Sequence, residues 1–140
     1  MNKLSIVIVN YNVQYFLEQC LHSCRKAMDY MVDKNPAFTS EIWVVDNNSK
    51  DGSVAMMKDR FSWVSLIANK DNRGFSTANN QAIKQSKAEH ILLLNPDTVV
   101  EEDTFYTCMA FMDDHEDAGG LGVKMIDGKG KFLPESKRGL

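Results

Sequence analysis

The stretch Leu4-Ser5-Ile6-Val7-Ile8-Val9 decides the fold class of this 140-residue chain. It is an unbroken run dominated by β-branched side chains, which is typical of a strand buried on both faces of a sheet. Burial on both faces indicates a parallel sheet that is covered by helices. Three later apolar runs predict further strands, over residues 42–45, 64–68 and 90–94.

Segments with a helical spacing of apolar residues separate and follow these runs. They predict four helices, over residues 13–33, 51–61, 75–83 and 105–112. Asn12 is placed to cap the first helix by accepting a backbone N–H, and Asp51 or Ser49 to open the second. Because parallel neighbours need crossover helices, the alternation predicts an α/β fold, a mostly parallel sheet with helices on both faces.

The rest of the chain predicts no second core. After the last helix, Asp127-Gly128 lies between the apolar residues 121–126 and 131–133, which predicts a hairpin about an Asp-Gly turn. The composition, 44% hydrophobic and 25% charged, is near the average for a soluble globular domain. A chain of this length has room for one domain.

The charge balance argues against a nucleic-acid partner, and the apolar runs argue against a membrane-spanning helix. Sixteen Lys and Arg against nineteen Asp and Glu give a formal charge of −3, so we expect no binding to nucleic acid. The longest apolar runs, residues 6–9 and 91–94, are far shorter than the roughly 20 residues of a membrane helix. No segment has the pattern of a secretory signal, and we expect a cytoplasmic protein.

The cysteines agree with a reducing compartment. Cys20, Cys24 and Cys108 are three in number and cannot all pair within the chain. Cys20 and Cys24 flank His22, which raises the alternative of a zinc site. A zinc site needs four converging ligands, and the paired motifs that supply them are missing. We therefore expect Cys20 and Cys24 to be core thiols on the apolar side of the first helix.

Polar residues follow the predicted strands, where ligands collect in parallel sheets. The glycine-rich fingerprints of dinucleotide-binding and P-loop proteins are absent, which excludes those two classes. Instead, Asp46 and Asp97 end two strands. One carboxylate can accept from a pyrimidine N–H and another can hold a divalent cation, while Arg73 can contact phosphates. Taken singly, each has an ordinary alternative: a turn and helix cap for Asp46, a turn for Asp97 and a solvated charge for Arg73.

The order and spacing of four segments carry more information than any one of them. They are residues 5–12 (SIVIVNYN), 44–53 (VVDNNSKDGS), 72–80 (NRGFSTANN) and 92–98 (LLLNPDT). Together they resemble the family 2 glycosyltransferases, and most closely the rhamnosyltransferase-like branch. The resemblance implies the GT-A fold, in which residues 1–140 are the nucleotide-sugar-binding portion, truncated before the acceptor-binding half.

The resemblance assigns the residues after the first two strands to the nucleobase. Asn10 and Tyr11 fall in the first motif, and Asp46 in the second, where it accepts a hydrogen bond from a pyrimidine N–H. Asn48 and Ser49 belong to the wall of the same pocket.

The later motifs are implied to hold the diphosphate and a metal. Arg73 approaches the diphosphate, and Asn79 supports the site from the helix that follows. Asn95 and Asp97 occupy the Asp-x-Asp position of the family, where the last carboxylate binds Mg²⁺ or Mn²⁺. Asn95 departs from that pattern: its amide can contact a ribose hydroxyl but supplies no charge, so the metal site rests on Asp97 and the phosphates.

The implied activity is an inverting, metal-dependent transfer of a sugar from a dTDP- or UDP-linked donor. The acceptor is a saccharide or a lipid-linked molecule in cell-surface polysaccharide synthesis, and the whole enzyme is compatible with peripheral membrane association. The catalytic base is expected beyond Leu140, so this chain alone should bind donor without transferring sugar. Two alternatives remain, a non-catalytic module that binds a nucleotide or sugar nucleotide and, less favoured, a flavodoxin-like signalling domain.

Overall fold

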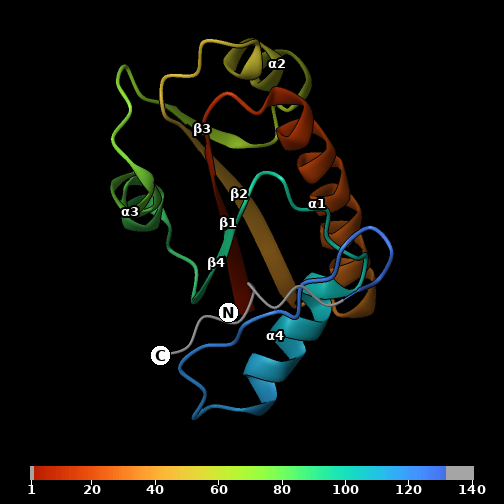
Figure 1. Ribbon diagram of the computed structural model, residues 1–140. Coiled ribbons are helices and arrows are strands. Elements are labelled where there is room, and N and C mark those ends of the chain that lie inside the picture. The colour runs from red at the N-terminus through yellow and green to blue at the C-terminus, as the bar shows by residue number, and fades with distance from the viewer. Residues whose placement is uncertain (1, 132–140) are drawn as a thin grey trace.

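A four-stranded parallel sheet forms the centre of the molecule (Figure 1). The structure is a computed structural model and describes residues 2–131. The strands are β1 (Asn2–Asn10), β2 (Phe38–Asp46), β3 (Ser65–Ala68) and β4 (His90–Leu94), in the spatial order β3-β2-β1-β4. The four predicted strands are thereby confirmed, and β4 lies at an edge of the sheet.

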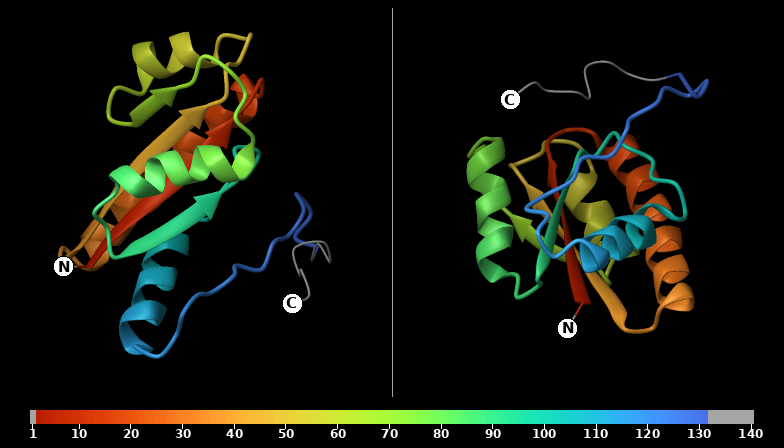
Figure 2. Two further views of the ribbon diagram at one scale, coloured as in Figure 1. Left: turned by 90° about the vertical axis from the view of Figure 1, so that its left-hand side faces the viewer. Right: turned by 90° about the horizontal axis from the view of Figure 1, so that it is seen from below.

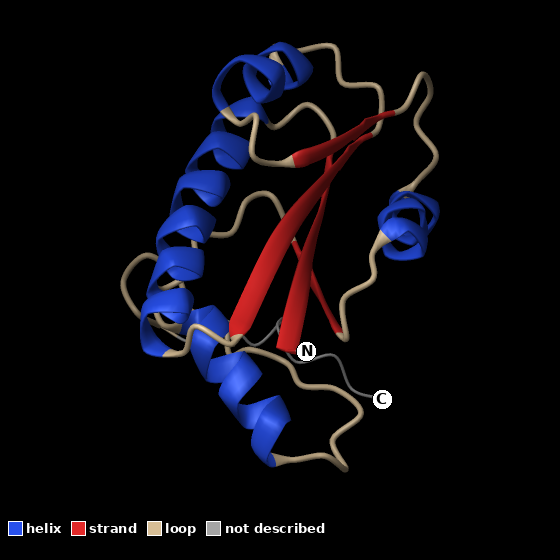
Figure 3. Ribbon diagram, turned by 180° about the vertical axis from the view of Figure 1, so that it is seen from behind, coloured by secondary structure: helices blue, strands red, loops and turns tan. Residues whose placement is uncertain are grey.

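Helices cover both faces of this sheet, as the sequence predicted. They are α1 (Gln14–Lys34), α2 (Ser53–Arg60), α3 (Phe75–Gln85) and α4 (Thr104–Asp114). Figures 2 and 3 show α3 on one side of the strands and the other three helices on the opposite side. Among the helices within residues 2–131, none has the length and apolarity needed to cross a membrane.

The alternating side chains of β1 explain why residues 6–9 of its sequence are apolar without a break. Ile6 and Ile8 point into the larger core, which β1 and β2 form with α1, α2 and α4. Val7 points to the other face, where it packs in a small cluster with Ala78 and Ala82 of α3. Both faces of β1 are therefore buried, and the hydrophobic effect selects an uninterrupted apolar strand.

The prediction of core cysteines is confirmed for α1. Cys20 and Cys24 are fully buried in the larger core. A hydrogen bond with Cys20, together with burial, raises the pKa of the Cys24 thiol far above its usual range. Both side chains thus act as small apolar groups.

The prediction for the start of the first helix is wrong in one respect. Val13 precedes α1, and Asn12 adopts a left-handed conformation with φ of 54° and does not cap the helix. The Asn12 Oδ1 atom instead accepts from the Lys50 backbone N–H at 2.7 Å. The acceptor for α1 comes from a distant residue, since Asp51 Oδ2 lies 3.0 Å from the Gln14 backbone nitrogen. Asp51 also accepts from the N–H of Ser53, so it does serve the start of α2, although Gly52 is the cap residue.

The predicted hairpin lies only partly within the described residues, which contain its first arm and its turn. A tight turn does exist, because the Asp127 backbone N–H donates to the Lys131 carbonyl at 2.7 Å. Residues 121–126, however, do not form a strand, and Leu121, Val123 and Ile126 are exposed. Phe132 and Leu133 of the predicted second arm lie outside the described residues.

Candidate functional site

A cavity of about 580 Å³ lies at the carboxyl ends of β1, β2 and β4. Its walls are both apolar and polar. The apolar wall comprises Val9, Val13, Phe16, Phe75 and Pro96, and the remaining lining residues are Tyr11, Asn47, Asn72, Gly74, Asn95 and Asp97. The cavity therefore combines apolar and aromatic surface with amide groups and one carboxylate, which is the composition of many small-molecule sites.

Three of the nine residues assigned from the sequence meet at this cavity. Tyr11 follows β1, while Asn95 and Asp97 follow β4, and all three are exposed lining residues. They come together because β1 and β4 are parallel neighbours and end at the same edge of the sheet. The other six, Asn10, Asp46, Asn48, Ser49, Arg73 and Asn79, do not line the cavity.

Asn10, Asp46 and Ser49 instead form a hydrogen-bonded cluster, in which Asn10 and Asp46 are buried. The Asn10 Nδ2 atom donates to Asp46 Oδ1 at 2.9 Å, and the Ser49 hydroxyl donates to the same oxygen at 2.7 Å. The Ser49 backbone N–H donates to Asp46 Oδ2 at 2.8 Å. Both carboxylate oxygens thus have partners within the chain, and Asp46 is only 1% exposed. This cluster fixes the turn after β2, in which Asn48 has a left-handed φ of 65°.

Arg73 lies next to the cavity on the loop between β3 and α3. Its chain neighbours Asn72 and Gly74 both line the cavity, while its own side chain is half exposed. The Arg73 Nε atom lies 3.1 Å from Asp71 Oδ1. An exposed ion pair of this kind contributes little stability, so the guanidinium can leave it for a ligand at small cost.

Asn79 supports the beginning of α3 from a buried position. Its Nδ2 atom donates to the Phe75 carbonyl at 3.1 Å. Its Oδ1 atom and the Oδ1 atom of Asn10 are buried without a partner in the part of the chain that the structure describes. Asn79 thereby contacts an element of the cavity wall, because Phe75 is a lining residue.

Sequence reasoning missed Asn47, which is a buried residue of the cavity wall. Side chains along a strand alternate between the two faces, so Asn47 faces the opposite side from Asp46 and the same side as Val9 and Tyr11. The alternation of β1 and β2 would have been sufficient to find it. Asn47 is 3% exposed, and its amide is bonded to the loop that carries Arg73.

The cavity contains one carboxylate that could hold a divalent cation. No group of three or more His, Cys, Asp or Glu side chains is arranged around a common point among residues 2–131. Mg²⁺ commonly takes one or two protein carboxylates and completes its shell with phosphate oxygens and water. A single carboxylate, Asp97, with the Asn95 amide in the same lining, is too few ligands to hold an ion by protein groups alone. It fits a cation that binds together with a diphosphate, whose oxygens supply further ligands.

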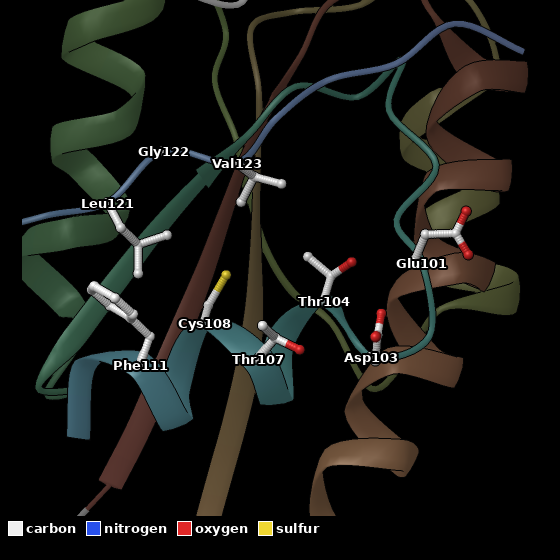
Figure 4. Close-up of a pocket in the computed structure, with 9 residues that line it drawn as sticks. All are labelled: Glu101, Asp103, Thr104, Thr107, Cys108, Phe111, Leu121, Gly122 and Val123. Atoms are coloured by element: carbon white, nitrogen blue, oxygen red, sulfur yellow. The ribbon is translucent and has the colours of Figure 1, made fainter. Parts of the chain in front are cut away.

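A second cavity of about 450 Å³ lies between α4 and residues 121–123 (Figure 4). Phe111, Leu121 and Val123 give it an apolar wall, and Cys108 points into it. Burial raises the pKa of the Cys108 thiol. None of the nine assigned residues lines this cavity, and it lies away from the strand ends.

Comparison with known proteins gives a consistent family. The family described as Glycosyl transferase family 2 matches residues 5–138. The poly(ribitol-phosphate) beta-glucosyltransferase of Bacillus spizizenii is 31% identical over 140 residues, which cover 96% of this chain and 21% of that protein. The poly(ribitol-phosphate) beta-N-acetylglucosaminyltransferase TarS of Staphylococcus aureus is 26% identical over 139 residues, 97% of this chain and 23% of TarS. The chain therefore spans less than a quarter of the length of these relatives.

Solved structures agree on the fold. S. aureus TarS 1-349 in complex with UDP superposes with a TM-score of 0.69 at 23% identity, over 81% of this chain and 33% of that one. The complex of the same protein with UDP-GlcNAc gives a TM-score of 0.66 at 24% identity. The expected GT-A fold is thereby confirmed.

Proposed function

Because the chain belongs to glycosyl transferase family 2, we propose that residues 1–140 form the nucleotide-sugar-binding portion of a transferase whose acceptor-binding half lies outside them. The observation that carries this proposal is the cavity at the carboxyl ends of β1, β2 and β4, which Tyr11, Asn47 and Asp97 line. Its volume of about 580 Å³ suits a small ligand, and its apolar and amide walls suit a nucleoside.

The donor of the proposed reaction is a UDP- or dTDP-linked sugar. The complexes of S. aureus TarS with UDP and with UDP-GlcNAc, on a similar fold, support a nucleotide sugar. Tyr11 offers an exposed ring at the cavity, against which a base can pack. Asn10, Asn48 and Ser49 belong to the hydrogen-bonded turn that follows β2 and stabilise it. The contact of Asp46 with a pyrimidine N–H stays a prediction: Asp46 Oδ2 accepts one hydrogen bond within the chain and can accept a second, but the carboxylate is almost completely buried and does not line the cavity.

The diphosphate is proposed to lie between Arg73 and Asp97, with Asn79 supporting the start of α3. When the sugar leaves, negative charge develops on the diphosphate, and the Arg73 guanidinium can donate to its oxygens. A bound Mg²⁺ or Mn²⁺ ion would neutralise part of the same charge. Asp97 is the carboxylate placed to hold that ion, and Asn95 can donate to a ribose or phosphate oxygen. Inversion at the anomeric carbon and a carboxylate base beyond Leu140 belong to the same proposal.

The acceptor is proposed to be a saccharide or a lipid-linked molecule of a cell-surface polymer. The names of the relatives support this class, since two act on poly(ribitol-phosphate). A third relative, GgaB of Bacillus subtilis, is a minor teichoic acid biosynthesis protein. It is 27% identical over 116 residues, which cover 80% of this chain and 12% of GgaB. The rhamnosyltransferase-like branch stays a prediction, because the two poly(ribitol-phosphate) relatives are named for the transfer of glucose and N-acetylglucosamine. A cytoplasmic site of action and peripheral membrane association likewise stay proposals.

Calorimetry followed by a transfer assay tests this function. We expect the chain to bind UDP or dTDP, more tightly with Mg²⁺ than with a chelator, and to transfer no sugar from a nucleotide sugar to a saccharide or lipid extract. General base catalysis and acceptor positioning each contribute a large factor to the rate, and the proposal places both outside residues 1–140. If the chain binds neither nucleotide, the proposed function fails. Robust transfer would instead place the base within this chain.

A further inference from the structure

Three amide side chains form a continuous chain of hydrogen bonds from α3 to the edge of the cavity. At one end, Gln81 of α3 and Asn69 form two reciprocal bonds: Asn69 Nδ2 donates to Gln81 Oε1 at 2.8 Å, and Gln81 Nε2 donates to Asn69 Oδ1 at 2.9 Å. Asn69 Nδ2 also donates to Asn47 Oδ1 at 3.1 Å. Asn69 is the first residue after β3, so the chain ties the start of the 69–74 loop to α3 and β2.

The far end of the same loop is bonded to the same Asn47 amide. The Arg73 backbone N–H donates to Asn47 Oδ1 at 3.4 Å, and Asn47 Nδ2 donates to the Gly74 carbonyl at 3.1 Å. A further bond holds the end of the loop: Asn72 Oδ1 accepts from the Gly74 N–H at 2.9 Å. Gly74 itself has a positive φ, which a glycine adopts without strain. Both ends of the loop thus meet at one buried side chain, while the Arg73 side chain is half exposed.

This arrangement limits the conformations from which Arg73 meets a ligand. A free loop loses conformational entropy for each residue that becomes fixed, which weakens any binding that needs the loop ordered. Bonds that fix the loop beforehand remove that loss. All three side chains are neutral amides, so their pairing does not depend on protonation.

We propose that Asn69 and Gln81, neither of which lines the cavity, are positioning residues that hold the Arg73 loop through Asn47 for a diphosphate ligand. The proposal rests on the proposed function, since it takes a nucleoside diphosphate as the ligand. It assigns a part in ligand binding to two side chains that touch no ligand themselves. Their effect should reach the phosphates through Arg73 and leave the nucleoside contacts unchanged.

Amide hydrogen exchange of the free protein tests whether these bonds hold the loop. Gln81→Leu should speed exchange of the Arg73 amide, whereas Gln85→Leu, an exposed position on the same helix, should not. The double variant Asn69→Gln with Gln81→Asn swaps the long and the short amide side chain and keeps the pair. It should restore slow hydrogen exchange at the Arg73 amide. Unchanged exchange at Arg73 in Gln81→Leu, with the fold intact by circular dichroism, overturns the proposal.

Binding of UDP and uridine in the presence of Mg²⁺ tests the consequence. Gln81→Leu should weaken UDP about five- to tenfold and leave uridine affinity unchanged, a split that general loosening of the fold would not produce. In an Arg73→Ala background the same substitution should cause no further loss. Equal losses for both ligands, or an undiminished loss without Arg73, overturn the proposal. If the wild-type chain binds no UDP or dTDP, the proposed function fails, and the exchange result alone decides whether these amides hold the loop.

Discussion

The Asn10 amide and the Asp46 carboxylate face each other across the paired ends of β1 and β2, with Nδ2 of Asn10 2.9 Å from Oδ1 of Asp46. Both residues are almost completely buried. Ser49 completes the cluster with its backbone N–H and its hydroxyl. Two strand ends and the turn after β2 are thus held by one carboxylate, and the next residue along the chain, Asn47, lines the cavity.

Removing this carboxylate should destabilise the fold. Asp46→Ala removes the acceptor of the buried Asn10 amide and of two donors of the half-buried Ser49, which should lower the free energy of unfolding by about 1 to 3 kcal/mol. Urea unfolding followed by circular dichroism measures this. Glu102→Ala, an exposed carboxylate, is the control and should change stability by less than about 0.5 kcal/mol. Equal effects at the two positions would show that the Asp46 cluster does not hold the strand ends.

Arg73 should contribute to the affinity for phosphates and not for the nucleoside. Arg73→Ala removes a charged donor, and we expect UDP affinity to fall about ten- to a hundredfold with uridine affinity unchanged. Calorimetry with both ligands measures the two affinities. Lys70→Ala, an exposed cation in the same loop, should have a much smaller effect. A loss shared by uridine would place Arg73 away from the diphosphate.

Asp97 should carry the metal dependence of nucleotide binding. With Asp97→Asn, we expect the gain in UDP affinity on adding Mg²⁺ to be lost, because no other carboxylate lines the cavity. Binding in the presence of a chelator should change little. Glu102→Gln should keep the full gain. An unchanged Mg²⁺ effect in Asp97→Asn would mean that the ion is held elsewhere.

Glu41 should make stability depend on acidic pH. Burial of this carboxyl opposes its ionisation, but hydrogen bonds from Ser5 and Lys3 and the charge of Lys3 outweigh it, so the pKa of Glu41 lies below its ordinary value of 4.5. The ionised form is favoured in the folded state, so its contribution is complete above that ordinary value and is lost as the pH falls through the lowered pKa. In Glu41→Gln, the urea concentration at the unfolding midpoint should therefore depend less on pH in this range. A profile identical to that of the wild type would contradict this.

The sequence was sufficient for the fold because its signals were local and strong. The apolar run of residues 4–9 and the helical periodicities each reflect burial within a single element, and the structure has all eight elements. The Asn12 cap was wrong because the acceptor for α1 comes from Asp51, which is brought close only when α1 and α2 pack together. The hairpin at residues 121–133 stays a prediction: its turn is present, and its second arm extends outside the described residues.

The site was predicted only in part for a related reason. Tyr11, Asn95 and Asp97 follow strands that end at one edge, so their meeting follows from a parallel sheet. Asp46 is at the right strand end but on the face that packs against the core cluster, and its neighbour Asn47 reaches the cavity. Sequence order brings a loop to a site, whereas strand alternation decides which of two adjacent side chains enters it.

Backbone amide shifts of the isotope-labelled chain, recorded during titration with UDP and with dTDP in the presence of Mg²⁺, test the central claim most directly. The strand-end cavity and the second cavity are lined by different residues, so the shifted backbone amides locate the ligand. We predict saturable changes at Tyr11, Asn47, Gly74 and Asp97, with none at Thr107 or Phe111 of the second cavity. Changes confined to the second cavity, or no saturable change with either nucleotide, would contradict the assignment of the strand-end cavity as a nucleotide-sugar site.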